Sequence, residues 1–353
     1  MASIDLPAIT RRRAVIEVKE ITKIYAATGG MLGQKPVKAL RGVSLTLADG
    51  EAISLIGESG CGKTTLGRII AGLEASTSGD LVFDGTALST LSPRERHAKF
   101  QQVQLIQQDP YGALNPARPL GEALADPLRL QAKRLGKDAS WVQMRAKELL
   151  QLVGLDPANT LYKYPHNLSG GQRQRFVIAR ALTVEPKVLV ADEAVSMIDV
   201  SLRLGILSLL SDLRSRLGIS VVFITHDVAA ARYVAPKGTV CVIYRGEIVE
   251  YGATDAIIAS PVHPYTQALL SAMPVLRGLE EPGPDRYIPA QDLDLRLDDE
   301  GGCLFRARCR FATDRCAQEH PPLLTVDEGR RLHACFYPEA RHVVAVPIEG
   351  ASL

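Results

Sequence analysis

The feature that most constrains this 353-residue chain is the stretch Gly-Glu-Ser-Gly-Cys-Gly-Lys-Thr-Thr at positions 57–65. An apolar run at 52–56 precedes it, and a helix-like run at 66–71 follows it. A glycine-rich loop between a strand and a helix, ending in Lys-Thr, fits the phosphate-binding loop pattern. The alternative is a glycine-rich turn before an ordinary helix, but the Lys-Thr pair after a strand favours phosphate binding. The sequence therefore predicts an α/β fold built around this loop.

These residue types suit the chemistry of a bound polyphosphate. Glycines let the backbone bend so that successive N–H groups point at phosphate oxygens, and the helix that follows adds its positive end. Lys63 can reach the β- and γ-phosphates, and the Thr64 hydroxyl can bind Mg²⁺. We expect nucleotide contacts from every residue of the loop: Gly57, Glu58, Ser59, Gly60, Cys61, Gly62, Lys63, Thr64 and Thr65.

Length and composition set the broad class. Apolar residues make up 46% of the chain, which is enough for a full core, and the net formal charge of +2 leaves no general nucleic-acid footprint. No apolar run approaches the roughly 20 residues that cross a bilayer, and the N-terminus lacks a signal-peptide hydrophobic region. We expect a soluble protein, or one that is peripheral through its partners.

The chain divides into segments that differ in expected secondary structure and in proline content. The first 85 residues mix antiparallel strands with the strand-loop-helix core, whereas residues 109–167 carry helical spacing punctuated by prolines, with Ser140 as the expected N-cap of a helix at 140–153. Beyond about Ser260 prolines become frequent and regular alternation stops. We predict a core of residues 1–260 with a helical insertion at about 109–167, and an extension at 261–353.

A second element of the site follows the apolar run at 188–191. Asp192 at the tip of a buried strand is the expected Mg²⁺ partner, and the adjacent Glu193 is placed to orient or deprotonate an attacking water. The alternative is an acidic strand-end pair that faces solvent. The presence of the phosphate-binding loop favours the magnesium and general-base roles.

A third element is Leu-Ser-Gly-Gly-Gln at 168–172, which resembles the signature motif of the ABC-transporter ATPases. The resemblance covers residues 15 to about 252. It implies an α/β fold of the P-loop NTPase class and of ABC type, with a RecA-like core, an antiparallel β subdomain, a helical insertion and a small Cys-rich C-terminal extension. By resemblance, nucleotide contacts also come from Tyr25 (adenine stacking), Gln108 (also Mg²⁺), Ser169, Gly170, Gly171, Gln172, Asp199 and the switch residue His226.

The signature loop makes a second anion-binding nest, since Ser and two glycines precede a helix. In the family that it resembles, this loop lies far from the P-loop of its own subunit, so two ATPase subunits pair head to tail with ATP between them. Taken without the other motifs, Tyr25 fits a packing residue as well as an adenine-stacking one. His226 likewise fits a structural residue as well as a switch residue. Two departures from the family pattern are Ala194 in place of Pro, and Ser-Met-Ile-Asp at 196–199 in place of Ser-Ala-Leu-Asp.

The tail resembles that of dipeptide, oligopeptide and nickel importers. The matching segments are His-Pro-Tyr-Thr-Gln-Ala-Leu-Leu at 263–270, the breaker-rich loop after Tyr25, the run at 108–116 and the cysteine-rich end that begins at Gly302-Cys303. Cys61 within the loop indicates the second of the two ATPase subunits that such importers often carry. Members of this group transport peptides, nickel or oligosaccharides, so the resemblance leaves the solute open.

Four cysteines cluster in this tail, at Cys303, Cys309, Cys316 and Cys335. Their spacing is wide and contains no Cys-x-x-Cys pair, so a zinc ribbon fits poorly. The resemblance implies a [4Fe–4S] cluster. Four reduced thiols, or adventitious disulfides, are the alternatives.

Together these features predict an ATP- and Mg²⁺-dependent ATPase subunit of a di/oligopeptide importer, peripheral on the cytoplasmic face of the inner membrane. The resemblance implies a second ATPase subunit, expected to be a paralogue, two transmembrane permease subunits and, indirectly, a periplasmic or extracellular substrate-binding protein, with no nucleic acid. Nickel or oligosaccharide import is the nearest alternative. A soluble ABC ATPase of translation or DNA repair is a further alternative, but such proteins usually carry two ATPase units or a long coiled coil, and this sequence shows neither. The presence of Lys63, Asp192, Glu193 and His226 argues against a regulatory subunit that binds ATP without hydrolysing it.

Overall fold

A computed structural model describes residues 13–26, 36–275, 277–289, 301–326 and 331–347. At its centre, five strands run parallel in the order β9-β3-β8-β7-β6 within a larger sheet. Nearly all of their residues are buried, because helices cover both faces, and such strands read as continuous apolar runs. The strands predicted at 52–56 and 188–191 are confirmed as β3 (Ala52–Ile56) and β7 (Val188–Asp192). The other three are β6 (Val103–Ile106), β8 (Ser220–Thr225) and β9 (Thr239–Tyr244).

One edge of this sheet is antiparallel. β10 (Glu247–Ala253) pairs with β9 as a hairpin, and β13 (Arg331–His333) and β12 (Leu324–Val326) add to its far side. The last two strands come from the C-terminal extension, so the main sheet contains residues from both sides of position 260.

The predicted antiparallel β subdomain is confirmed as a second sheet in the order β2-β1-β4-β5. The pairing of β1 shifts register at Glu20 against both of its neighbouring strands, β2 and β4, and Glu20 takes a positive φ of 49° there. This sheet shares a hydrophobic core with α1 (Lys63–Ile70). Its strands are β1 (Ala14–Tyr25), β2 (Val37–Ala48), β4 (Ser78–Phe83) and β5 (Thr86–Ala87).

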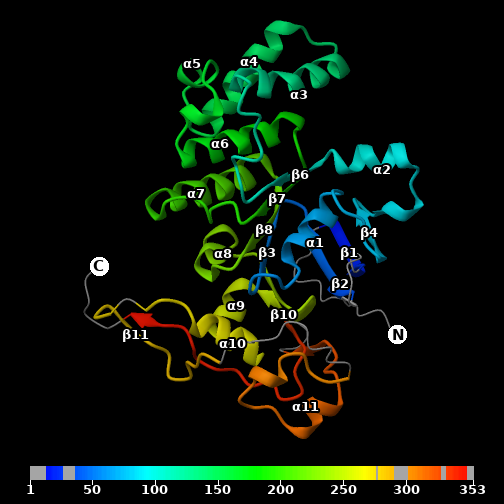
Figure 1. The fold of residues 1–353 in the computed structure, drawn as a ribbon, viewed down its shortest axis with the longest axis vertical. Helices are drawn as coiled ribbons and strands as arrows, with labels where there is room; N and C mark the ends of the chain where they lie inside the picture. Colours follow the sequence, from blue (N-terminus) through cyan, green and yellow to red (C-terminus); the bar gives the residue numbers. More distant parts are fainter. Residues whose placement is uncertain (1–12, 27–35, 276, 290–300, 327–330, 348–353) are drawn as a thin grey trace, which may run out of the picture.

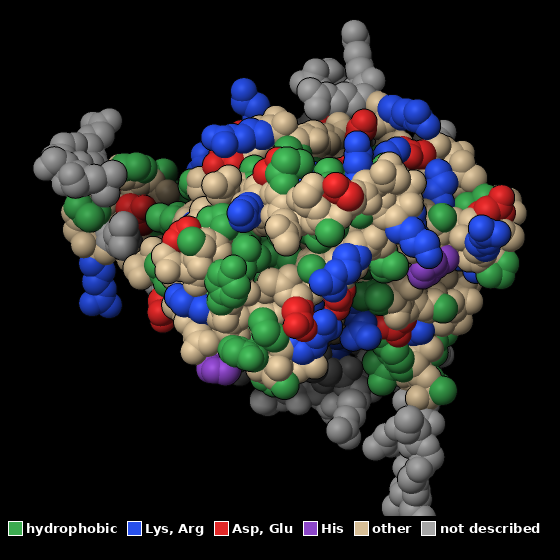
Figure 2. All heavy atoms as spheres, turned by 90° about the horizontal axis from the view of Figure 1, so that it is seen from above, with side chains coloured by type: hydrophobic (Ala, Val, Ile, Leu, Met, Phe, Trp, Pro, Cys, Tyr) green, Lys and Arg blue, Asp and Glu red, His purple; other side chains and the backbone are tan. Residues whose placement is uncertain are grey.

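Helices form one end of the molecule, at the top of Figure 1. α3 (Leu120–Leu135) and α4 (Ala139–Leu152) pack on α6 (Gly170–Ala181), which in turn contacts α7 (Val200–Leu217). α5 (Pro157–Thr160) packs on α4. Seen from above, this end presents basic and acidic side chains interspersed with apolar ones (Figure 2). α2 (Pro93–Phe100) lies apart, on the side of β6.

The predicted N-cap of α4 is wrong. Asp138, not Ser140, caps this helix: its carboxylate accepts a hydrogen bond from the Trp141 N–H at 3.0 Å. Ser140 already lies in the first turn, and its hydroxyl donates to the Asp138 carboxylate at 2.7 Å. An ionised side chain at the extended residue before the helix satisfies the free N–H groups better than a hydroxyl inside it.

The C-terminal part lies at the other end of Figure 1 from the helical insertion. Tyr244, Tyr265 and Phe305 join β9 and the extension in one buried cluster. No helix in the described part of the chain is both long and apolar enough to span a bilayer. The remaining elements are α8 (Val228–Val234), α9 (Thr254–Ala259), α10 (Pro264–Ser271), α11 (Asp314–Gln318), β11 (Glu280–Glu281) and β14 (Val346–Pro347).

Candidate nucleotide site

The phosphate-binding loop joins the end of β3 to the start of α1, which begins at Lys63 rather than at the predicted residue 66. Gly57 and Gly62 have φ angles of 155° and 107°. A Cβ atom would lie 2.2 Å from the Ile243 carbonyl oxygen at Gly57 and 2.4 Å from the Ala39 carbonyl oxygen at Gly62. The loop therefore requires glycine at both positions, because neighbouring backbone leaves no room for a side chain.

Lys63 is held across this loop. Its side chain is buried, and its ammonium donates to the carbonyl oxygens of Gly57 and Glu58, each at 2.8 Å. Both acceptors are neutral, so these bonds position the ammonium without neutralising its charge. A phosphate group bound in the loop would supply the negative charge that this geometry favours.

Thr64 and Asp192 meet at the start of α1 and the end of β7. The Thr64 hydroxyl donates to the Asp192 carboxylate at 3.1 Å. Burial is the main cause that raises the pKa of Asp192, and the neighbouring charge of Glu193 raises it further. A hydroxyl and a buried carboxylate are oxygen ligands of the kind that Mg²⁺ prefers, and a bound cation stabilises the ionised carboxylate.

Glu193 connects the ends of three strands. Its φ of 46° turns the chain out of β7, and its backbone N–H donates to the Ile224 carbonyl oxygen at 2.9 Å. The carboxylate accepts a hydrogen bond from Gln108 Nε2 at 2.9 Å and lies 3.3 Å from His226 Nδ1. The structure thus brings three predicted residues together, with Gln108 bonded to Glu193 rather than placed against Asp192. A left-handed conformation in a non-glycine residue is a strained one, of the kind found at functional sites.

Tyr25 lies beside the loop at the end of β1. Its hydroxyl is 3.4 Å from Thr65 Oγ1, and the Lys23 ammonium lies 4.9 Å from the centre of its ring. The pKa of Tyr25 is raised, first by burial and then by a hydrogen bond with Glu74, a neighbour that the sequence did not suggest. The segment 27–35, which the sequence singled out as a breaker-rich loop, lies outside the described residues.

The signature loop caps α6 and lies apart from the phosphate-binding loop. Ser169 Oγ accepts from the Gln172 N–H at 3.3 Å, and Gln172 Oε1 accepts from the Ser169 N–H at 3.1 Å, which makes a capping box. α6 packs against α3, α4, α7 and β6, whereas α1 packs against β2, β6, β7 and β8. Asp199, at the start of α7, is exposed.

Sequence reasoning missed two residues that hold the phosphate-binding loop. The Tyr265 hydroxyl accepts from the Glu58 N–H at 2.8 Å, and Arg308 donates two hydrogen bonds to the Glu58 carboxylate, each at 2.8 Å. These partners lie 207 and 250 positions along the chain from Glu58. No local pattern relates residues at such separations, so only the fold reveals the contact.

The four clustered cysteines line one small cavity in the extension. All four are free thiols, and the cavity between Phe305 and Phe336 measures about 20 Å³. Burial is the main cause that raises the pKa of Cys303 and of Cys335 to about 11. Among the described residues, no three or more His, Cys, Asp or Glu side chains are arranged so as to hold a metal ion.

Comparisons with known proteins agree with this geometry. Residues 40–196 match the ABC transporter family, and residues 249–316 match the oligopeptide/dipeptide transporter C-terminal region. The chain is 40% identical to the dipeptide transport ATP-binding protein DppF of Escherichia coli (strain K12), over 93% of this chain and 95% of that protein. It is 38% identical to the di/tripeptide transport ATP-binding protein DppF of Pseudomonas aeruginosa (strain UCBPP-PA14), over 92% and 98%.

Solved structures give the same result. The ATP-binding cassette MJ0796, in a dimeric post-hydrolysis state bound to ADP and Pi, superimposes with a TM-score of 0.58 at 29% identity and covers 68% of this chain and 98% of that one. CbiO1 of Clostridium perfringens, part of the ABC transporter complex CbiONQ, superimposes with a TM-score of 0.58 at 25% identity and covers 70% and 91%. The chain therefore belongs to the ABC transporter family, as one of its ATP-hydrolysing subunits.

Proposed function

We propose that this subunit powers the import of dipeptides and oligopeptides across the inner membrane, as a peripheral protein on its cytoplasmic face. The observation that carries the proposal is the match of residues 249–316 to the oligopeptide/dipeptide transporter C-terminal region, beside an ABC match at 40–196. Relatives named for dipeptide and di/tripeptide transport align over more than nine-tenths of the chain. In this proposal residues 1–260 form the ATPase domain and residues 261–353 the extension.

The proposed chemistry assigns a role to each group at the strand ends. Lys63 and the loop N–H groups bind the phosphates, and Thr64 with Asp192 would hold Mg²⁺, which neutralises charge on the phosphate oxygens. Glu193 accepts the proton of the attacking water, while Gln108 and His226 hold its carboxylate in place through the contacts at 2.9 and 3.3 Å. Tyr25 stacks on the adenine ring.

The proposed ATPase unit is a head-to-tail pair, with a paralogue as the second subunit. The signature residues 169–172 and Asp199 of one subunit then complete the site of the other. The exposed position of Asp199 and the open space around Gly170 support this pairing, because both are available to a partner. ATP stabilises the closed pair, and loss of the γ-phosphate lets it open.

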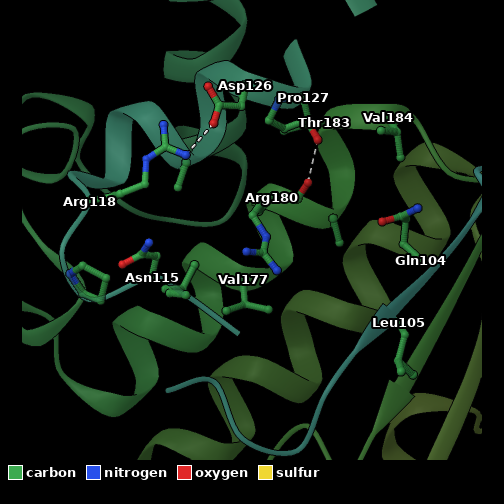
Figure 3. A pocket seen from close by; sticks show the side chains of 14 residues that line it. Gln104, Leu105, Asn115, Arg118, Asp126, Pro127, Val177, Arg180, Thr183 and Val184 are labelled. Atoms are coloured by element: carbon green, nitrogen blue, oxygen red, sulfur yellow. Dashed lines mark hydrogen bonds and ion pairs between the residues drawn. The ribbon is translucent and has the colours of Figure 1, made fainter. Parts of the chain in front are cut away.

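We propose that a helix of each permease docks near Gln108 and the helical insertion. Residues of the insertion and of β6 line a hollow of about 340 Å³ that would receive it. Figure 3 shows Arg118 directed toward Asp126, and Arg180 among the side chains that line this hollow. Arg118 is paired with Asp126 at 2.7 Å, and Arg180 donates to the Ala113 carbonyl oxygen at 2.6 Å. Burial lowers the pKa of Arg180, so an acidic group on the permease helix would be well placed here.

We further propose that Cys303, Cys309, Cys316 and Cys335 bind a [4Fe–4S] cluster. Four thiols around one cavity are the ligand type and number that such a cluster takes, but the described side chains are not arranged to hold a metal ion and would have to reorient around it. When bound, the cluster would cross-link chain segments that are poor in apolar residues. Anaerobic purification with absorbance spectra and iron analysis tests this: about four irons per chain supports it, and colourless, iron-free protein contradicts it.

Uptake into proteoliposomes tests the transport function. The chain is assembled with its partner ATPase, both permeases and the binding protein, and labelled dipeptide, oligopeptide, nickel and oligosaccharide are supplied separately with ATP inside. We expect ATP-dependent uptake of the peptides alone, and loss of that uptake in the Glu193→Gln variant. Uptake of nickel or oligosaccharide without peptide would show that the solute assignment is wrong.

A further inference from the structure

The C-terminal extension reaches the nucleotide site through one residue. Arg308 makes two hydrogen bonds of 2.8 Å to the Glu58 carboxylate, and its side chain is only 10% exposed. The guanidinium carbon lies 5.5 Å from the centre of the Phe305 ring and 6.0 Å from that of Tyr244. This two-bond geometry is the strong form of an ion pair, and the aromatic rings hold the guanidinium in one orientation.

The same loop residue is held at its backbone. The Glu58 N–H donates to the hydroxyl of Tyr265, which is itself buried on α10, and the Glu58 carbonyl oxygen accepts from Lys63. The Glu58 pairing is the main cause that raises the pKa of Arg308. A chain of contacts therefore runs from the extension through Glu58 to the ammonium of Lys63, the group proposed to bind the nucleotide phosphates.

We propose that Arg308, assisted by Tyr265, is a positioning residue for the phosphate-binding loop. Arg308 fixes the position of Glu58, and with it the Glu58 carbonyl oxygen that holds Lys63. It also neutralises the Glu58 carboxylate, which lies beside the site of the nucleotide phosphates. Without Arg308 this carboxylate would repel the nucleotide phosphates and leave the loop less ordered. The inference rests on the proposed nucleotide site, and it makes ATP affinity depend on the extension.

Packing within the extension holds Arg308 in place. Phe305 is almost fully buried, packs on Tyr265 with ring centres 5.5 Å apart, and lines the four-cysteine cavity. Arg308 directly precedes Cys309 in the chain. The extension, packed against β9 through Phe305, thus supplies a fixed side chain to the phosphate-binding loop.

The test is the dissociation constant of MgATP, measured by calorimetry on the full chain, with the melting temperature recorded for each variant. Arg308→Gln should weaken binding about tenfold, the scale of one charged hydrogen-bond pair. Arg308→Lys, which keeps the charge but not the two-bond geometry, should recover part of the loss. Glu58→Gln combined with Arg308→Gln should bind more tightly than Arg308→Gln alone, because no unpaired carboxylate remains.

Glu319→Gln is the matched control, since it breaks an Arg–carboxylate pair of 3.0 Å with Arg315 in the same extension, where both side chains are more than half exposed. It should bind MgATP as the wild type does. Wild-type affinity in Arg308→Gln overturns the inference, even if its melting temperature falls, because that pattern shows a purely structural role. A wild-type chain that fails to bind MgATP overturns the proposed nucleotide site itself.

Discussion

The phosphate-binding loop and the signature loop both place glycines before a helix, but their glycines have different causes. At Gly57 and Gly62 the backbone of the same chain excludes any Cβ, and both φ angles are positive. At Gly170 an added Cβ would have no heavy atom within 4 Å, apart from its chain neighbours and its own helix backbone. The first loop is therefore explained within one chain. In the second loop the chain itself leaves room for a side chain at Gly170, which fits the proposed contact with a second subunit.

The largest expected effect comes from the residues around the first loop. Glu193→Gln should lower ATP hydrolysis by about 10²–10⁴-fold, the range for a lost general base, while MgATP still binds. Phosphate release and calorimetric binding measured side by side check this. Asp255→Asn is the control, because its 3.7 Å ion pair with Arg232 lies on an exposed surface. Unchanged turnover in Glu193→Gln would remove this carboxylate from the role of base.

The next prediction tests the two loops against each other. Gly57→Ala should destabilise the fold by about 1–3 kcal/mol and abolish MgATP binding, because it adds strain and a backbone clash. Gly170→Ala should leave the melting temperature and the single-chain affinity unchanged, yet reduce turnover in the assembled pair. Melting curves, calorimetry and phosphate release on both variants separate these outcomes. Equal losses of stability in the two variants would break the comparison.

The smallest expected effect concerns Tyr25. Tyr25→Ala should weaken MgATP binding by about 1–3 kcal/mol if the ring stacks on adenine. Ser169→Ala should not change single-chain affinity, since its hydroxyl is engaged within its own capping box. Calorimetry on the two variants sharpens the distinction between the loops, and an unaltered dissociation constant in Tyr25→Ala would refute stacking.

The parallel core and the loop could be predicted because their signals are local. Buried strands such as β7 are short apolar runs, and the loop motif fixes its own strand-loop-helix context. The helix starts were less accurate, with α1 beginning at Lys63 rather than at 66.

Contacts between distant residues could not be predicted from the sequence. Arg308 and Tyr265 reach Glu58 only after the extension folds back, and β13 joins β10 by only a few residues. The pairing of Gln108 and His226 with Glu193 likewise depends on three strands ending at one edge of the sheet. Motif order placed these residues in one family pattern, but only the structure shows which atoms meet.

The most direct test of the account is a structure of the closed, ATP-loaded pair, trapped with Glu193→Gln. We predict that Ser169 of each subunit lies within hydrogen-bond distance of the terminal phosphate that the other subunit holds at Lys63. A closed, ATP-loaded pair in which Ser169 is remote from every terminal phosphate would contradict the proposal that two chains build each site.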